Sequence, residues 1–399
     1  MNFVIKYIRC LWLVVFLGIA TTSCDSDADL PDLTGEERLL SIGFKVATSN
    51  GFELEAGADR ENYVDWKNSY RIYFFDIDKK YIAQFKPKNG VTSKASDDEN
   101  ATEYKAVGEI PEELISRTMN GNYLKAFKIV VLANWDSYPD ENTLTPGVTT
   151  IDNICEAEEG KFNCLFPTDL GKTESDWKIP FYGVQEYESM LLTKETTELE
   201  TPVALLRAMT KVEVILDPTI KDESGNSTNG QWSDFFIISL TLRHYNMEGY
   251  CAPIGVYERK DYPDEKENPT LHLVENSKND NLAFYQESTN KWIAYVPEYS
   301  NHGTDNTYIE MKLNYQLEKD DPYKLYFADY SGGTTPSESN IDLIRNNIYR
   351  FTVSKKGYQM QLYVSNWEGY YENDFEYGNG QFTTPVAPWE DEIEIPIEY

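Results

Sequence analysis

Short apolar segments in which every second side chain points the same way recur along almost the whole chain. Clear examples are "YRIYFFD" at 70–76, "KWIAYVPEY" at 291–299 and "NIYRFTV" at 347–353. A period of two places one row of side chains on a core and is typical of a half-buried β-strand. The 29 Tyr and 18 Phe residues favour the same structure, because aromatic rings fit a pleated surface. Loops rather than crossover helices join the segments, so the sequence predicts a mainly β, antiparallel fold and argues against a nucleotide-binding α/β fold.

The spacing of these segments predicts two tandem antiparallel β-sandwich domains. A chain of 399 residues is long enough for two ordinary domains, each able to bury its own core. The alternation stops in the Thr- and Glu-rich stretch "LTKETTELETP" at 192–202 and resumes with "VALLRAMTKVEVILD" at 203–217. We therefore place a boundary near residue 200, with an N-terminal domain over 39–200 and a C-terminal domain over 201–399.

Three local patterns refine the N-terminal half. Asp76 to Lys80 is typical of a tight turn between two strands, which explains Asp76 and Asp78 without a calcium site. The continuous apolar run within 123–134 predicts a strand in the middle of a sandwich. The segment "PEELISRTM" at 111–119 is the one stretch of this half that we expect to be helical.

The first residues are expected to form a secretory signal peptide over 1–23. Lys6 and Arg9 precede the apolar run "CLWLVVFLGIATTS", which is short for a membrane span and ends in small residues. The residues before Cys24 resemble the lipobox that the lipoprotein signal peptidase cleaves, with Thr21 where Leu is usual. This resemblance implies acylation of Cys24 and attachment to the outer membrane. The alternative is ordinary signal cleavage near the same place, which would leave Cys24 as a thiol.

An acidic stretch, "CDSDADLPDLTGEE", follows and predicts a flexible tether over 24–38. It resembles the acidic segment after the lipidated Cys of surface-exported lipoproteins in Bacteroidetes, although its charges could equally serve solubility. The whole chain has a formal net charge of −31, which becomes −33 once Lys6 and Arg9 leave with the signal peptide. Such a charge argues against nucleic acid or anionic lipid as a partner of the folded part.

Cysteine and histidine usage gives little support for metal binding or catalysis. Cys155 and Cys164 enclose a short loop-like stretch and could form a disulfide, with Cys251 left over, or all three could be buried thiols. There is no CxxC pair, HExxH motif or GxSxG nucleophile elbow in the sequence. The only histidines are His244, His272 and His302. We therefore predict no metal, no cofactor and no enzymatic activity.

Six segments together resemble the fimbrillin and Mfa-like lipoproteins of Bacteroidetes, the subunits of type V pili. They are "YRIYFFD", "FKIVVLANW", "IPFYG", "LLRAMTKVEV", "WIAYVPEY" and "RNNIYRFTV", in the order and at the approximate spacing of that family. The resemblance implies two transthyretin-like β-sandwich domains, a lipidated precursor and assembly with other pilin subunits by donation of a strand. It also implies a structural or adhesive role as stalk, tip or anchor, with host or bacterial surface ligands. The alternative is a surface lipoprotein that binds glycans through exposed aromatic rings.

Several conspicuous polar and aromatic residues have ordinary structural interpretations. Four cations in strand-like segments are expected to be solvated at strand edges, where they discourage unwanted pairing, rather than to form a cationic site: Arg207, Lys211, Arg345 and Arg350. Asn134 and Trp135 are expected to form a turn and a packed ring, and Trp367 is expected to pack as well.

Pilins of the resembled family mature by tryptic-type cleavage after the first strand, and Arg60 is the candidate site here. It lies in the polar, Gly-containing stretch "EAGADRENY", where a protease could reach the backbone. Cleavage at Arg38 would remove only the tether. The alternative is a subunit that is not processed, as in the anchor proteins of the family.

The chain finishes on "EDEIEIPIEY", in which alternate residues form an apolar row. Ile393, Ile395, Ile397 and Tyr399 are candidates for a strand donated to a neighbouring subunit. Pro396 suits an edge strand, since it has no N–H to donate. The alternative is that this tail pairs within its own domain.

Overall fold

The computed structural model describes residues 38–47, 61–95, 101–120, 123–135, 138–155, 161–163, 179–191, 196–221, 227–231, 233, 235–246, 248–251, 279–299, 301, 306–314, 322–327, 342–343, 345–354, 359–366 and 395–396. The predicted signal peptide and Cys24 lie outside these residues. Strands predominate in the described part of the chain, and its helices are short. The fold is mainly β, as the sequence predicts.

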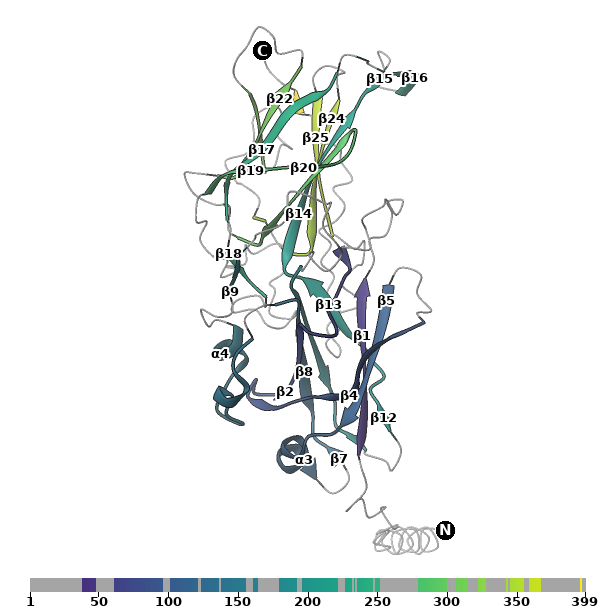
Figure 1. Ribbon diagram of the computed structural model, residues 1–399, viewed down its shortest axis with the longest axis vertical. Helices are drawn as coiled ribbons and strands as arrows, with labels where there is room; N and C mark the ends of the chain where they lie inside the picture. Colours follow the sequence, from purple (N-terminus) through teal and green to yellow (C-terminus); the bar gives the residue numbers. More distant parts are fainter. Residues whose placement is uncertain are drawn as a thin grey trace, which may run out of the picture.

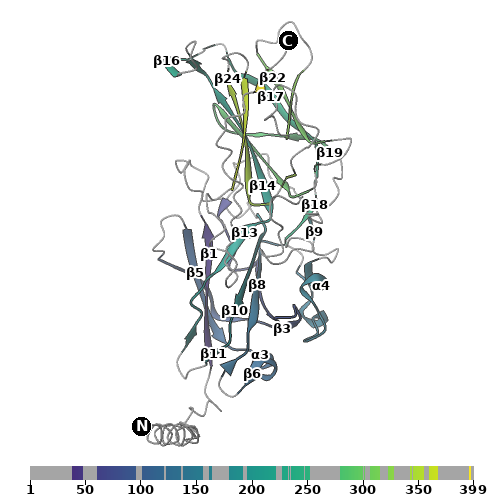
Figure 2. The same cartoon turned by 180° about the vertical axis from the view of Figure 1, so that it is seen from behind.

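The molecule is elongated, with the strands of the N-terminal half at one end and those of the C-terminal half at the other (Figures 1 and 2). One nine-stranded sheet dominates the N-terminal half, in the order β3-β2-β8-β10-β13-β1-β5-β4 with β12 beside β1. Its strands are β1 (Leu39–Ala47), β2 (Tyr70–Asp76), β3 (Tyr81–Gln84), β4 (Pro87–Lys94), β5 (Ala101–Glu109), β8 (Phe127–Ala133), β10 (Phe181–Tyr187), β12 (Thr197–Glu198) and β13 (Val203–Arg207).

Smaller elements complete this half. A three-stranded sheet consists of β6 (Met119–Asn120), β7 (Tyr123–Leu124) and β11 (Met190–Leu191). The helices are α3 (Glu112–Thr118), the 3-10 helix η1 (Glu141–Thr143) and α4 (Ile151–Cys155). Glu112 and Glu113 occupy the first turn of α3 and Arg117 its last turn, which complements the helix dipole at both ends.

The C-terminal half contains two main sheets. The first has the order β20-β21-β14-β24-β25-β26 and the second the order β19-β17-β22-β23. Their strands are β14 (Met209–Asp217), β17 (Ile237–Tyr245), β19 (Asn279–Ala283), β20 (Tyr285–Ser288), β21 (Lys291–Pro297), β22 (Tyr308–Leu313), β23 (Tyr323–Tyr326), β24 (Asn347–Ser354), β25 (Gln359–Asn366) and β26 (Ile395–Pro396). Two short pairs are added, β15 (Thr219–Lys221) with β16 (Ser227–Gln231) and β9 (Lys161–Asn163) with β18 (Glu248–Tyr250).

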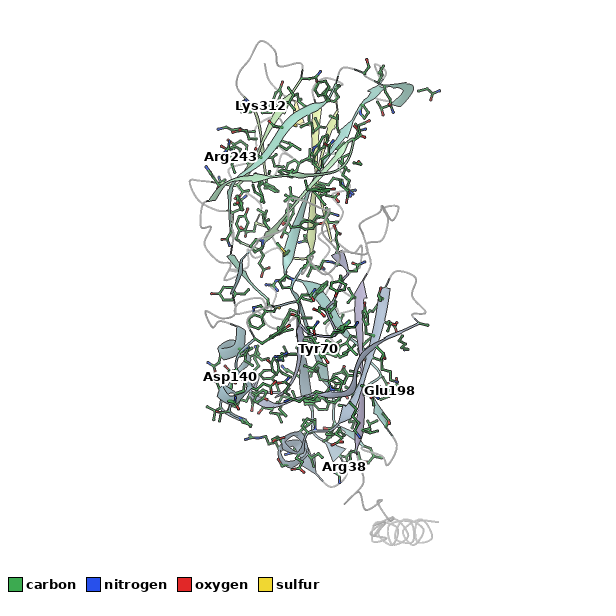
Figure 3. The ribbon with its side chains drawn as sticks, viewed as in Figure 1. Arg38, Tyr70, Asp140, Glu198, Arg243 and Lys312 are labelled. Carbon is green, nitrogen blue, oxygen red and sulfur yellow. The ribbon has the colours of Figure 1, made fainter. Side chains whose placement is uncertain are left out.

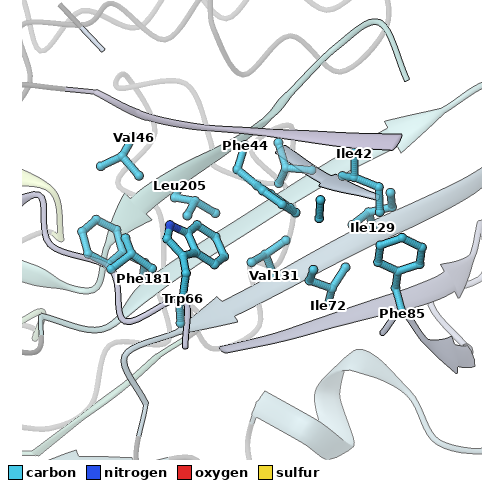
Figure 4. Close-up of a cluster of buried hydrophobic side chains, with 14 of the residues drawn as sticks. Ile42, Phe44, Val46, Trp66, Ile72, Phe85, Ile129, Val131, Phe181 and Leu205 are labelled. Carbon is cyan, nitrogen blue, oxygen red and sulfur yellow. The ribbon is translucent and has the colours of Figure 1, made fainter. Parts of the chain in front are cut away.

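Apolar side chains fill both faces of the N-terminal sheet around β8, whose seven residues are all buried. On one face, Phe44 and Trp66 pack near Val131 and Leu205 (Figure 4). On the other face, Val130 and Leu132 pack with Trp135 and with Ile151 of α4. The uninterrupted apolar run of this strand therefore reflects its place between two buried layers.

The two sheets of the C-terminal half share a separate core. Val212 and Val214 of β14 lie in one buried cluster with Leu242 of β17 and Ile309 of β22. This alternation of inward-facing residues is the period-two pattern that the sequence carries.

The two halves meet where β13 ends at Arg207 and β14 begins at Met209, so Ala208 alone joins the N-terminal sheet to the next one. The Ala208 N–H donates to the Pro180 carbonyl at 2.7 Å. Met209, Ile293 and Ile348, from strands β14, β21 and β24 of the C-terminal half, belong to the apolar core of the N-terminal half. The halves are therefore joined by a packed junction.

The local predictions for the N-terminal half are largely confirmed. The β2–β3 hairpin turns at 76–80, where the Asp76 N–H donates to the Lys80 carbonyl at 2.9 Å and Lys79 has φ 63°. Helix α3 coincides with the predicted helical segment. Helix α4 was not predicted, because its five residues are too few to show a helical period.

Candidate functional site

The first described strand, β1, lies inside its sheet rather than at an edge. It pairs antiparallel with β5 along its whole length, from Leu39 opposite Glu109 to Ala47 opposite Ala101. On its other side it pairs in parallel with β12 and β13. Removing β1 would therefore leave unpaired backbone groups on strands at both sides.

The inward face of β1 forms an apolar row that is fully buried. Its members are Leu40, Ile42, Phe44 and Val46. The Phe44 ring lies 5.1 Å from that of Trp66, which in turn lies 5.3 Å from the Tyr104 ring. Each such side chain contributes about 1.5–3 kcal/mol when buried. An empty β1 position would combine an apolar strip with two open strand edges, and an extended apolar segment could satisfy both.

Arg60 and the other residues of 48–60 lie outside the described residues. The chain resumes at Glu61, which is 5% exposed and reaches the C-terminal half. Its Oε1 lies 2.7 Å from the Nζ of Lys211 on β14 and accepts a hydrogen bond from the Tyr295 hydroxyl of β21. The backbone carbonyl of Glu61 accepts from Nε of Arg207 at 3.0 Å.

A second buried carboxylate, Glu213, lies next to this contact and is surrounded by cations. Its Oε1 is 3.0 Å from Nζ of Lys211 and 3.4 Å from Nζ of Lys291. Its Oε2 accepts from Nε of Arg350 at 2.7 Å. Burial alone would raise the pKa of Glu213, but Lys211, Arg350 and Lys291 together hold it at about 2. Burial alone would lower the pKa of Lys211, but Glu61 and Glu213 raise it above its ordinary value.

Arg345 makes a third buried polar contact at the junction. Its Nε donates to Oε1 of Glu298 at 2.8 Å, and its Nη1 and Nη2 donate to the carbonyls of Cys251 and Tyr250 at 2.6 and 3.0 Å. The Cys251 side chain is buried in the outer apolar layer of the N-terminal half, where its thiol donates to the Phe181 carbonyl at 3.1 Å. Burial raises the pKa of this thiol to about 12. Arg345 therefore fastens a segment that itself packs on the N-terminal half.

The prediction that four cations would be solvated at strand edges is wrong, and Arg350 lies on the interior strand β24, where it pairs with the buried Glu213. Arg207 is 0% exposed and Lys211 and Arg345 are buried, whereas Arg350 is half-buried. They are not a free cationic site, because carboxylates and carbonyls surround them. One signal for Lys211 was present in the sequence. Glu213 follows it at the spacing that places both side chains on one face of a strand.

The other structural interpretations hold where the chain is described. Asn134 adopts φ 57°, and its Oδ1 accepts from the Asp65 N–H while its Nδ2 donates to the carbonyls of Tyr63 and Ile179. Trp135 is buried. Both predictions are confirmed, and Asn134 also links three separate segments. Trp367 lies outside the described residues.

The remaining predicted site residues are only partly placed. Cys155 ends α4, whereas Cys164, Cys24, Ile393, Ile397 and Tyr399 lie outside the described residues. Ile395 and Pro396 form β26, which pairs antiparallel with Met360 and Gln359 of β25 in the same chain.

No group of metal-binding side chains and no helix suited to crossing a membrane occurs within the described residues. Among the large apolar side chains there that are exposed, two are aromatic, Tyr123 on β7 and Phe236 beside β17. They belong to different halves and do not form the coplanar platform expected of a glycan-binding face.

No protein-family model and no curated protein sequence matches this chain. Similar solved structures include a fimbrial assembly protein from Parabacteroides distasonis, with 16% identity, coverage of 83% of this chain and 97% of that chain, and a TM-score of 0.47. The tip fimbrial protein Mfa3 from Porphyromonas gingivalis is 13% identical over 82% of this chain and 98% of that chain, with a TM-score of 0.43. A fimbrilin from Porphyromonas gingivalis is 10% identical over 80% and 90%, with a TM-score of 0.40. These neighbours are fimbrial proteins of Bacteroidetes, the class that the six sequence segments resemble.

Proposed function

We propose that this chain is a structural or adhesive subunit of a type V fimbria, whose precursor is held at the outer membrane through Cys24 and which joins other subunits by strand exchange. The observation that carries the proposal is the position of β1. It is an apolar strand inside its sheet, close to the start of the chain, and its place could be taken by a strand from another copy.

Proteolysis after Arg60 is the proposed step that frees this position. The cut would separate β1 from Glu61, which remains attached to the rest of the fold through Lys211 and Tyr295. Mass spectrometry of the surface form tests this step. An N-terminus still at Cys24 in assembled fibres would rule out proteolysis after Arg60.

The C-terminal tail is the proposed donor. Ile393, Ile395 and Ile397 would enter the emptied position while Glu392, Glu394 and Glu398 face water. Of these residues, Ile395 lies in β26, which pairs with β25 of the same chain at the end of a sheet rather than inside one. Donation would exchange this short edge contact for a longer one in the neighbour.

The test compares two triple variants of the mature chain, each folded as a monomer and then cut after Arg60 by a trypsin-like protease. The first variant replaces Ile393, Ile395 and Ile397 with Ser, and the control replaces Glu392, Glu394 and Glu398 with Ser. We expect heat-resistant oligomers in the control and none in the first variant, with both monomers folded by circular dichroism. Oligomers in both would eliminate tail donation.

The membrane attachment has its own test. Cys24→Ala should move the protein from the outer-membrane fraction to the soluble fraction and abolish incorporation of labelled fatty acid, because two or more acyl chains are needed for stable anchoring. Retention of Cys24→Ala in the membrane fraction would contradict lipid anchoring at this residue.

A further inference from the structure

Glu61 joins the two halves of the molecule through a single buried carboxylate. It precedes β2 in the N-terminal half, whereas Lys211 and Tyr295 project from β14 and β21 of the C-terminal half. Both side chains of the pair with Lys211 are less than one-tenth exposed. Water therefore does little to screen this attraction.

The contact extends from the side chain to the backbone. Arg207 donates from Nε to the Glu61 carbonyl at 3.0 Å and from Nη2 to Oδ1 of Asn62. Its guanidinium lies 5.6 Å from the centre of the Phe181 ring, which fixes its orientation. The Lys211 ammonium, the Tyr295 hydroxyl and the Arg207 guanidinium thus all bind one short segment, Glu61 and Asn62.

The charge of Glu213 is balanced independently of Glu61. Lys211 lies between Glu61 and Glu213, and Glu213 has further cationic partners in Lys291 and Arg350. Loss of Glu61 would therefore remove the acceptor for Tyr295 and one of the two carboxylates within 3.0 Å of Nζ of Lys211, without removing the charge balance of Glu213.

We infer that Lys211 and Tyr295 form a carboxylate-binding site of the C-terminal half, that Glu61 is its resident ligand with its backbone held by Arg207, and that this contact clamps the junction between the halves. The inference does not depend on strand exchange. In a fimbrial subunit it would keep the segment before β2 in place whichever copy supplies the first strand.

The site can be tested by removing the Glu61 side chain and supplying acetate, a small carboxylate, in its place. Glu61→Ala should lower the melting temperature of the full mature chain by about 5–10 °C, since a buried charge loses its partner. Sodium acetate at about 0.2 M should then raise it by ~3 °C more than sodium chloride at the same ionic strength, by filling the vacant position. We expect no such difference between the salts for the native chain or for Glu61→Ala combined with Lys211→Met.

Cys251 reports on the clamp itself, because it packs on the N-terminal half and its thiol is protected there. Labelling with iodoacetamide, followed by peptide mapping at Cys251, should be at least tenfold faster in Glu61→Ala than in the native chain. Glu198→Ala is the matched control, since it removes a carboxylate that pairs with Lys105 at 2.9 Å on the surface.

Glu61→Gln covers the case in which Glu61→Ala does not fold. The amide keeps an acceptor for Tyr295 but not the charge, so Cys251 labelling should accelerate and acetate should have no specific effect, because the position is filled. Equal labelling in the native chain, the Glu61 variants and Glu198→Ala would overturn the clamp. Equal effects of acetate on the native chain and Glu61→Ala would overturn the binding site. Neither result would bear on polymer formation.

Discussion

Strands β1 and β14 occupy matching positions in their sheets but are held in different ways. Each has nine residues, an antiparallel neighbour on one side and a parallel neighbour on the other. The inward row of β1 is entirely apolar. On β14, Lys211 and Glu213 are buried among partners of opposite charge.

This difference follows from the surroundings of each strand. The outer face of β1 is only partly covered, since Lys45 is half-buried there, although Ser41 on the same face is buried. The first six residues of β14 are buried on both faces, because that end of the strand lies in the junction. Apolar contacts can be made by any segment of suitable shape, whereas buried charges require particular partners. The comparison suggests that β1 is replaceable and that β14 is not.

The largest effect is expected at the junction. Glu213→Leu should reduce the free energy of unfolding by about 5 kcal/mol, because it leaves three cations without their shared carboxylate. Combining it with Arg350→Met should cost clearly less than the sum of the two single changes, since the partners are removed together. Urea unfolding of the four chains measures this coupling. Strict additivity would mean that the cluster does not act as a unit.

The apolar row of β1 should be sensitive to volume rather than to identity. Phe44→Ala should cost about 4 kcal/mol by opening a cavity beside Trp66, while Phe44→Leu should cost less than about 1.5 kcal/mol. Urea unfolding again provides the measurement. Equal losses in the two variants would show that β1 needs a specific side chain and would weaken the contrast with β14.

A fall in pH should weaken the contribution of β14 to stability but not that of β1. The pKa of Glu213 is depressed to about 2 in the folded chain, from 4.5. Its charged form therefore stabilises the fold above pH 4.5, and this contribution, on the order of 3 kcal/mol, is lost as the pH falls toward 2. The difference in unfolding free energy between the native chain and Glu213→Gln should shrink over that range. The same difference for Phe44→Ala should stay constant.

The smallest effect is expected on the outer side of β1. Lys105 of β5 and Glu198 of β12 form an ion pair whose Nζ and Oε1 are 2.9 Å apart, with the Glu198 side chain exposed and that of Lys105 half-buried. Lys105→Met should change stability by less than about 0.5 kcal/mol, since water and salt screen such pairs. A loss comparable to that of Glu213→Leu would show that the outer face also fixes β1.

The alternating patterns were sufficient to predict the longer apolar strands, such as β2, β8, β14, β21 and β24, because local hydrophobicity determines which side chains face a core. The same information could not show that Arg207 and Lys211 would be buried. Their partners Glu61, Asn62 and Asn346 are distant in sequence, and only the packing of one half on the other brings them together. Of the candidate functional residues, Cys24 and Arg60 stay predictions, since they lie outside the described residues.

The direction of β1 has a mechanical consequence. The strand runs along the long axis of the molecule, and Arg38 lies near the end opposite Lys312 (Figures 1 and 3). A pull on the chain at Arg38 would therefore act along β1 and stretch its ladder with β5 in shear. All nine register pairs of that ladder, from Leu39 to Ala47, would share the force at once instead of opening one after another. A surface protein under flow would resist traction at this strand far better than a hairpin pulled open from its end.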